Sequence, residues 1–245
     1  MLTVRKMRGA AVGAQAIDRG GTVQRTSADR KRLAYLLAKR YLDIVLSLLA
    51  LALLWPVLLL VALMIRLDSR GPAVFRQERM GYDWRARRQR PFVMYKFRTM
   101  MHNCDQRVHE ELIQKWVRGL MNAQREGDLV KLTNDPRITR VGGFLRKTSV
   151  DELPQLWNVL KGEMSLVGPR PVPLYEVAEY QPWHRRRLEA TPGLTGLWQV
   201  KGRGLASMDD MTRLDIQYIE RQSMLLDVEI LLRTIPAVLS GRGAA

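Results

Sequence analysis

The longest apolar stretch of the chain runs from Ile44 to Ile65 and is interrupted only by Ser47 and Pro56. Its length is close to the ~20 residues that a helix needs to cross a bilayer. Basic residues flank it on both sides: Arg30, Lys31, Arg32, Lys39 and Arg40 precede it, and Arg66, Arg70, Arg76 and Arg79 follow it. Because such residues normally mark one side of a membrane, both ends are expected on the same side. Pro56 cannot donate an interior helix hydrogen bond. We therefore predict a re-entrant helical hairpin, with a kinked spanning helix as the alternative.

Shorter patterns after this stretch predict a β-hairpin and an amphipathic helix. Strand-like runs at Ala73–Gln77 and Phe92–Phe97 are separated by Gly81-Tyr82-Asp83-Trp84 and a basic cluster, an arrangement typical of a hairpin. Between Gln106 and Glu126, apolar residues recur at helical spacing with charges between them, which indicates an amphipathic helix.

A second amphipathic helix is predicted near the carboxy terminus, where four apolar residues recur at helical spacing. They are Leu225, Val228, Leu232 and Ile235. Core packing and membrane contact both explain this pattern. Trp183, followed by the cationic run Arg185-Arg186-Arg187, suits either a lipid headgroup layer or an exposed basic turn.

Together these elements predict a mixed α/β, mostly helical fold, because strands and helices do not alternate regularly. We divide the chain into a mobile basic tail over residues 1–33, a re-entrant membrane helix over residues 34–70 and a membrane-surface domain over residues 71–245. Amphipathic helices of this domain are expected at the membrane interface.

Charge and composition limit the classes of partner and of metal site that the chain can have. The chain has 245 residues with 40 Lys and Arg against 24 Asp and Glu, a formal net charge of +16 at pH 7. Nucleic acid, anionic lipid and phosphorylated small molecules all fit such a charge. The single cysteine, Cys104, excludes an intramolecular disulfide. With three histidines and no other cysteine, zinc-type spacing is absent, so a metal site would use carboxylates and favour Mg²⁺.

The candidate chemistry lies between Arg146 and Pro171, where the adjacent acids Asp151 and Glu152 sit among cations. Two carboxylates can hold Mg²⁺ or supply a nucleophile, and arginines neutralise phosphate oxygens. Ser149 and Glu152 also match a capping box, which is the structural explanation of the pair. Whether Ser149 or Asp151 caps the helix, both acids would lie at the amino-terminal end of a helix that runs to Lys161-Gly162, where anions are favoured.

Ordered motifs along most of the chain resemble the monotopic phosphoglycosyl transferases, bacterial sugar transferases that load a sugar 1-phosphate onto a membrane polyprenyl phosphate. The resemblance covers Lys39 to about Arg242 and is closest to the short exopolysaccharide-type members. Its motifs are Lys39-Arg40-Tyr41-Leu42-Asp43, Tyr95-Lys96-Phe97-Arg98-Thr99-Met100, Asp135-Pro136-Arg137-Ile138-Thr139, Leu145-Arg146-Lys147-Thr148-Ser149, Asp151-Glu152-Leu153-Pro154-Gln155, Gly168-Pro169-Arg170-Pro171 and Pro192-Gly193-Leu194-Thr195-Gly196.

The resemblance implies a ping-pong reaction at the cytoplasmic face of the bacterial inner membrane. It implies that Asp151 attacks a UDP-sugar, expels UMP and carries a phosphosugar to undecaprenyl phosphate, with Glu152 as the acid associated with Mg²⁺. Arg146 is linked to phosphate recognition, and Pro169-Arg170-Pro171 to the nucleotide end. Lys96, Arg98 and Arg203 complete the candidate phosphate- and substrate-binding residues. Besides donor and acceptor, membrane lipids are expected partners and nucleic acid is not; a homodimer is left open.

Two departures from the family's usual sequence concern which sugar is preferred. The family often has Ser-Gly-Arg-Asn where this chain has Lys201-Gly202-Arg203-Gly204, and Gln222 stands where Trp is frequent. Two other functions compete with the transferase. One is a membrane-tethered basic protein that binds anionic lipid or nucleic acid without catalysis. The other is a metal-assisted hydrolase that releases sugar phosphate into water.

Overall fold

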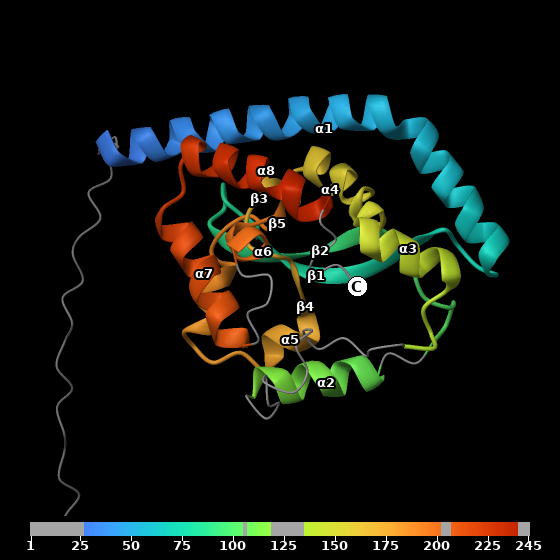
Figure 1. Cartoon of the computed structure of the whole chain (residues 1–245). Helices are drawn as coiled ribbons and strands as arrows, with labels where there is room; N and C mark the ends of the chain where they lie inside the picture. The colour runs from blue at the N-terminus through green and yellow to red at the C-terminus, as the bar shows by residue number, and fades with distance from the viewer. Residues whose placement is uncertain (1–26, 105–106, 119–134, 202–206, 240–245) are drawn as a thin grey trace, which may run out of the picture.

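The computed structural model describes residues 27–104, 107–118, 135–201 and 207–239. Its first element, α1 (Ser27–Asp68), is one continuous helix that includes Pro56. The helix begins earlier than the boundary expected at residue 34. Figure 1 shows that α1 changes direction towards its carboxy-terminal end. It is long and apolar enough to cross a membrane, and only 11% of its most apolar window is buried inside the protein, so it is not a core helix.

The predicted β-hairpin is confirmed, although both strands are longer than expected. Strand β1 (Val74–Asp83) pairs with β2 (Arg88–Phe97) in antiparallel register. The turn therefore lies after Asp83 and not at Gly81, which is a buried strand residue. Asp83 closes this turn, because its carboxylate accepts hydrogen bonds from the backbone N–H groups of Arg85 and Ala86. A short strand, β4 (Val172–Pro173), joins the other edge of β1.

The remaining elements surround this sheet, as the layers in Figure 1 show. They are α2 (Arg107–Val117), α3 (Arg140–Thr148), the 3₁₀ turn η1 (Val150–Glu152), α4 (Gln155–Lys161), β3 (Ser165–Val167), α5 (Leu174–Ala178), the 3₁₀ turn η2 (His184–Leu188), β5 (Gly193–Thr195), α6 (Leu197–Lys201), α7 (Met208–Glu220) and α8 (Met224–Leu239). The predicted mixed, mostly helical class is confirmed. The amphipathic helix expected at 106–126 is confirmed as α2; residues 119–134 lie outside the described residues.

The main core lies between β2 and the helices α4, α7 and α8. Phe92 and Met94 of β2 pack with Val159 of α4, and Tyr218 and Ile230 of α7 and α8 complete the cluster. Beside it, β3 and β5 form a two-stranded parallel sheet. Their contact is so close that a Cβ on Gly193 would collide with the backbone of Gly168, so glycine is required there.

The amino-terminal half of α1 is fastened to this body by polar contacts. Lys39 pairs with Asp227 of α8 at 2.8 Å, and Arg40 donates to the carbonyl oxygens of Val159 and Leu160 at the end of α4. Asp43 accepts hydrogen bonds from Ser165 Oγ and the Leu166 N–H. The family-like motif at residues 39–43 is therefore an attachment motif.

The carboxy-terminal end of α1 is fastened to the same body at another point. The guanidinium of Arg98 donates to the backbone carbonyls of Ser69 and Arg70, just beyond the helix. Asp68 accepts the Val141 N–H at the start of α3. Both ends of the apolar helix thus contact one globular domain.

Several helices expose apolar side chains. On α8 the predicted stripe is exposed, from 43% at Val228 to 80% at Leu225, so core packing does not explain it. Asp227 and Ile230 are the buried residues of this helix instead. Phe144 of α3 and Trp157 of α4 are also exposed. The cationic run of η2 is divided: Arg185 and Arg186 are exposed, and Arg187 is buried.

Candidate active site

The two acids lie on a tight turn between α3 and α4. Helix α3 ends at Ser149, whose left-handed backbone (φ 58°) makes it the C-cap. Asp151 and Glu152 follow in the 3₁₀ turn η1, and α4 begins after Pro154. Ser149 makes no side-chain capping bond, so the capping box is wrong. Neither predicted helix start is correct, because Pro154 itself occupies the N-cap position of α4. The predicted end at Gly162 is confirmed (φ 79°).

Glu152 is held as an anion by two cations from different parts of the chain. Lys96 of β2 lies 2.7 Å from Glu152 Oε1, and Arg170, from the loop after β3, lies 3.2 Å from the same oxygen. Burial alone would raise the pKa of Glu152, but the charges and hydrogen bonds of Lys96 and Arg170 outweigh it and lower that pKa. The sequence-predicted acid and two of its predicted cations therefore meet in space.

Asp151 is in the opposite electrostatic situation. Its side chain is buried, and burial together with the Glu152 charge raises its pKa, although Lys96, Arg146 and Arg170 act against this. Within the described ranges, no hydrogen-bond donor reaches the Asp151 carboxylate. A carboxylate with a raised pKa and few donors is more basic, and so more nucleophilic, than one held by ion pairs. The pair is thus divided into one fixed anion and one available carboxylate.

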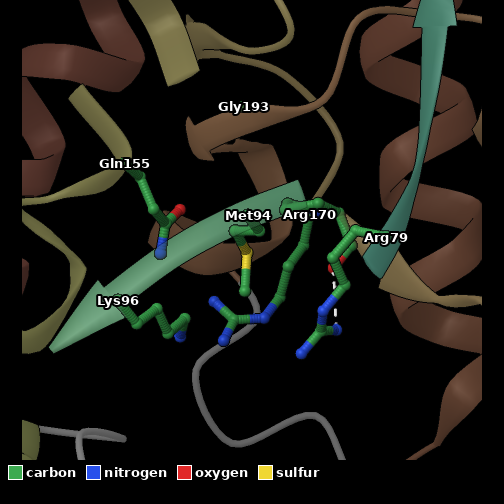
Figure 2. Close-up of a pocket in the computed structure, with 7 residues that line it drawn as sticks. Arg79, Met94, Lys96, Gln155, Arg170 and Gly193 are labelled. Atoms are coloured by element: carbon green, nitrogen blue, oxygen red, sulfur yellow. Dashed lines mark hydrogen bonds between the residues drawn. The ribbon is translucent and has the colours of Figure 1, made fainter. Parts of the chain in front are cut away.

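A small cavity opens beside Lys96 and Arg170, the two cations that hold Glu152. It is lined by Arg79, Met94, Lys96, Gln155, Arg170, Pro171 and Gly193. Figure 2 shows Lys96, Arg170 and Arg79 in a row, with Arg170 between the other two. Three cations on the wall of a small cavity suit an anionic group of a ligand.

Not every predicted residue lies at this cavity. Arg146 donates through Nε to Thr99 Oγ1 at 2.9 Å, and its charge acts on Asp151. Pro169 is buried and accepts the Gly193 N–H through its carbonyl. The guanidinium of Arg98 is directed to the end of α1. Arg203 lies outside the described residues.

Four lining residues, Arg79, Met94, Gln155 and Gly193, are not among the site residues predicted from the sequence. Of these, Arg79 is the charged one, and the sequence places it only among the cations after the apolar stretch. The signal was its strand phase: it shares a face of β1 with Gln77 and with the buried Gly81. A charged residue on the inward face of a strand is a candidate for function.

A metal ion would depend on the acid pair. In the described part of the chain there is no group of three or more His, Cys, Asp or Glu side chains. Mg²⁺ commonly uses one or two carboxylates and completes its shell with water and substrate phosphates. Asp151 and Glu152, beside a cationic cavity, fit that donor set. Glu152 Oε1 is already shared by two cations.

The fold and the site thus define a protein with a long exposed apolar helix and an acid pair beside a cationic cavity, an arrangement suited to phosphate chemistry. Comparison with known proteins agrees: residues 34–241 match the family described as bacterial sugar transferase, and the chain belongs to this family.

Three relatives illustrate the family. The galactosyl transferase CpsE of Streptococcus agalactiae is 44% identical over 87% of this chain and 44% of its own length. The exopolysaccharide production protein ExoY of Sinorhizobium fredii is 39% identical over 85% of this chain and 88% of its own. The UDP-glucose:undecaprenyl-phosphate glucose-1-phosphate transferase of Caulobacter vibrioides is 41% identical over 91% and 79%. The chain spans less than half the length of CpsE and of some other relatives.

Proposed function

We propose that this protein transfers a sugar 1-phosphate from a UDP-sugar to undecaprenyl phosphate and so begins the synthesis of an exopolysaccharide or another glycoconjugate. The observation that carries the proposal is the division of the acid pair. Lys96 and Arg170, which line the cavity, hold Glu152, whereas no ion pair holds the adjacent Asp151 among the described residues. The names of several relatives, among them a UDP-glucose:undecaprenyl-phosphate glucose-1-phosphate transferase, support the donor and the acceptor.

In the proposed first step, a carboxylate oxygen of Asp151 attacks the sugar-bearing phosphorus of the donor. A bond forms between that oxygen and phosphorus, the bond from phosphorus to the bridging oxygen breaks, and UMP leaves with the electron pair. In the second step a phosphate oxygen of undecaprenyl phosphate attacks the same phosphorus. The bond to Asp151 breaks, which releases undecaprenyl-diphosphate-sugar and regenerates the carboxylate.

The cations of the site make this approach feasible. An anionic nucleophile is repelled by the phosphate oxygens. Lys96 and Arg170 offset that repulsion at the cavity, and Arg146 adds its charge near Asp151 from outside it. Mg²⁺ is the proposed cofactor, with Asp151 and Glu152 as its candidate ligands. When bound, it would neutralise charge on the donor phosphates. Because Lys96 and Arg170 share Glu152 Oε1, they are well placed to turn towards the substrate phosphates when another cation takes up that carboxylate.

We further propose that α1 is a re-entrant membrane helix and that the domain lies on the cytoplasmic face of the inner membrane. Two observations support this topology. Both ends of α1 contact the same globular domain, through Arg40 and Asp43 at one end and Asp68 at the other, which is difficult to combine with a straight spanning helix. Basic residues also flank both ends. The bend in α1 and Pro56 are consistent with a helix that enters and leaves one leaflet.

The exposed apolar residues also suit a domain that lies on the membrane surface. Leu225 and Leu232 of α8, Phe144 of α3 and Trp157 of α4 would be unfavourable in water as a group, and a membrane interface would cover them. This brings α3 and α4, which hold the acid turn between them, to the membrane from which a lipid acceptor would arrive.

The test is a reconstitution. Purified protein with Mg²⁺ is incubated with a panel of UDP-sugars, with and without undecaprenyl phosphate, and UMP and lipid products are followed. The proposal predicts sustained UMP release and a lipid-linked diphosphate sugar only when the acceptor is present. Free sugar phosphate formed at equal rate without acceptor would indicate a hydrolase instead. Salt-sensitive binding of lipid or nucleic acid with no turnover of any donor would indicate a binding protein.

A further inference from the structure

Arg79 is a cation of the cavity that the acid pair does not engage. It lies on β1, the central strand of the three-stranded sheet, opposite Phe92 and Pro173. One terminal nitrogen donates to the Pro171 carbonyl at 3.1 Å, and the other donates to Gln77 Oε1 at 2.6 Å. Its Nε is buried and has no hydrogen-bond partner in the described part of the chain. The guanidinium is thus only partly satisfied.

The charge of Arg79 is compensated only from a distance, by Glu176 and Glu152. No carboxylate of the described residues lies within ion-pair distance of it, in contrast to Lys96 and Arg170, which both reach Glu152. Burial and the charge of Arg170 lower the pKa of Arg79 to about 10. Buried charges in proteins are normally paired, because an unpaired one is costly. A half-buried guanidinium on a cavity wall, with a buried Nε and no ion pair to any described residue, indicates an anionic ligand.

The position of Arg79 in the row of cations indicates which anion. Figure 2 shows Arg170 between Lys96 and Arg79. Lys96 and Arg170 both reach Glu152 and Arg79 does not, so Arg79 lies at the end of the row away from the acid. In the proposed reaction the sugar-bearing phosphorus must be beside Asp151. The second phosphate of the donor, which leaves as UMP, then extends away from the acids and towards Arg79.

We propose that Arg79 binds the phosphate of the departing nucleotide and, through the Pro171 carbonyl, positions the Pro169-Arg170-Pro171 loop around it. The inference rests on the proposed function and names a further substrate-binding residue for it. An arginine suits both tasks, because its planar fork can keep the Pro171 bond while a further N–H meets a phosphate oxygen. A purely structural role would need only the bonds to Pro171 and Gln77.

The experiment measures binding of UMP and of inorganic pyrophosphate to the full-length protein in nanodiscs by calorimetry, together with kcat and KM for a UDP-sugar. The variants are Arg79→Met, Arg79→Lys and the control Arg76→Met. Arg76 lies on the same strand, is exposed and stacks on Tyr95 at 5.9 Å from the ring centre. We expect Arg79→Met to weaken UMP binding and raise KM by at least about tenfold. Arg79→Lys, which keeps the charge, should lie between it and the parent, and Arg76→Met should match the parent.

Thermal unfolding of each variant separates ligand binding from folding. UMP binding by Arg79→Met at the parental affinity would overturn the inference. So would equal losses in Arg79→Met and Arg79→Lys that follow their losses of stability, since these would indicate a structural role. If Arg79→Met does not fold, Arg79→Lys decides: weaker UMP binding at an unchanged unfolding temperature supports the inference, and unchanged binding refutes it. If pyrophosphate binding depends on Arg79 but no UDP-sugar releases UMP, Arg79 is an anion-binding residue and the proposed reaction is refuted.

Discussion

Two clusters of charged side chains, each joining basic residues to an acid, differ in how far they are open to solvent. In the first, Arg187 donates from Nε and a terminal nitrogen to Asp215 Oδ2 at 2.9 and 2.6 Å, and its other terminal nitrogen donates to Tyr180. Side-chain exposure is 3% for Arg187 and 0% for Asp215. In the second, Lys96 and Arg170 share Glu152, and Arg170 is 38% exposed. The first cluster is enclosed by protein, and the second opens on a cavity.

The pKa values of the two acids follow this difference. Burial raises the pKa of Asp215 to about 6 even beside Arg187, so its ionisation is costly in an enclosed site. Two cations lower the pKa of Glu152 in the more open site. An enclosed cluster therefore holds the fold together. The cluster beside Arg79, which has no ion pair to any described residue, has charge left for a ligand.

The largest expected effect comes from removing the carboxylate that no donor holds. Asp151→Asn should lower kcat by at least about 10⁴-fold, the scale seen when a nucleophile is lost. The unfolding free energy at neutral pH should stay equal or rise, because a raised native pKa means that ionised Asp151 destabilises the folded state. Steady-state UMP release and chemical denaturation check both. An active Asp151→Asn would contradict the proposed mechanism.

The enclosed cluster should respond in the opposite way. Arg187→Met leaves Asp215 as a buried charge without a partner and should cost about 3–5 kcal/mol of stability. The molecules that remain folded should keep the parental KM for the UDP-sugar. As a matched control, Arg187→Met combined with Asp215→Leu removes this ion pair and should recover part of the loss; Glu176, 3.6 Å from Arg187, keeps its bond from Tyr180. Denaturation curves for the two variants test this, and a selective loss of kcat at unchanged stability would place the cluster in the catalytic machinery.

Glu152→Gln should affect activity and stability together. Loss of the anion that orders Lys96 and Arg170 should reduce kcat/KM by about 10²-fold or more. Because the native pKa of Glu152 is lowered, its stabilisation is complete above pH 4.5 and disappears as the pH falls towards about 2. The variant should therefore be less stable at neutral pH and lose less stability on acidification. Parallel pH–stability curves for parent and variant would disprove this assignment.

The smallest effect is expected at Arg98, a predicted substrate-binding residue whose guanidinium contacts the end of α1. Arg98→Lys should cost about 1–3 kcal/mol of stability through the lost carbonyl contacts. KM for the UDP-sugar should be unchanged. Kinetics of the reconstituted variant check the prediction, and a raised KM with unaltered unfolding would show that Arg98 contacts the substrate.

Much of this architecture was predictable from local pattern. The apolar length of α1, the alternation in the hairpin and the spacing on α2 and α8 each specified an element. Turn geometry was not predictable in the same way: Ser149 ends α3 in a left-handed conformation and Pro154 begins α4. The capping-box pattern at Ser149 and Glu152 did not reveal that two helices, and not one, meet at the acids.

Contacts between distant segments were the other limit. Motif order brought Lys96, Glu152 and Arg170 into one hypothesis, and the structure brings their side chains together. The same motif placed Arg98 with them, although its position just after the end of β2 directs it to the end of α1. Arg79 carried no motif signal of its own, because its importance follows from the pairing of β1 with β4 and from the carbonyl of Pro171.

The central claim is a covalent phosphosugar on Asp151. The most direct measurement is mass spectrometry of the protein after brief incubation with a UDP-sugar and Mg²⁺ in the absence of undecaprenyl phosphate, followed by rapid quench and proteolysis. We predict that the peptide containing Asp151 gains the mass of one sugar phosphate, that UMP appears in equal amount, and that added acceptor removes the adduct. An unmodified peptide at every time point, from protein that makes lipid product at full rate, would contradict the account.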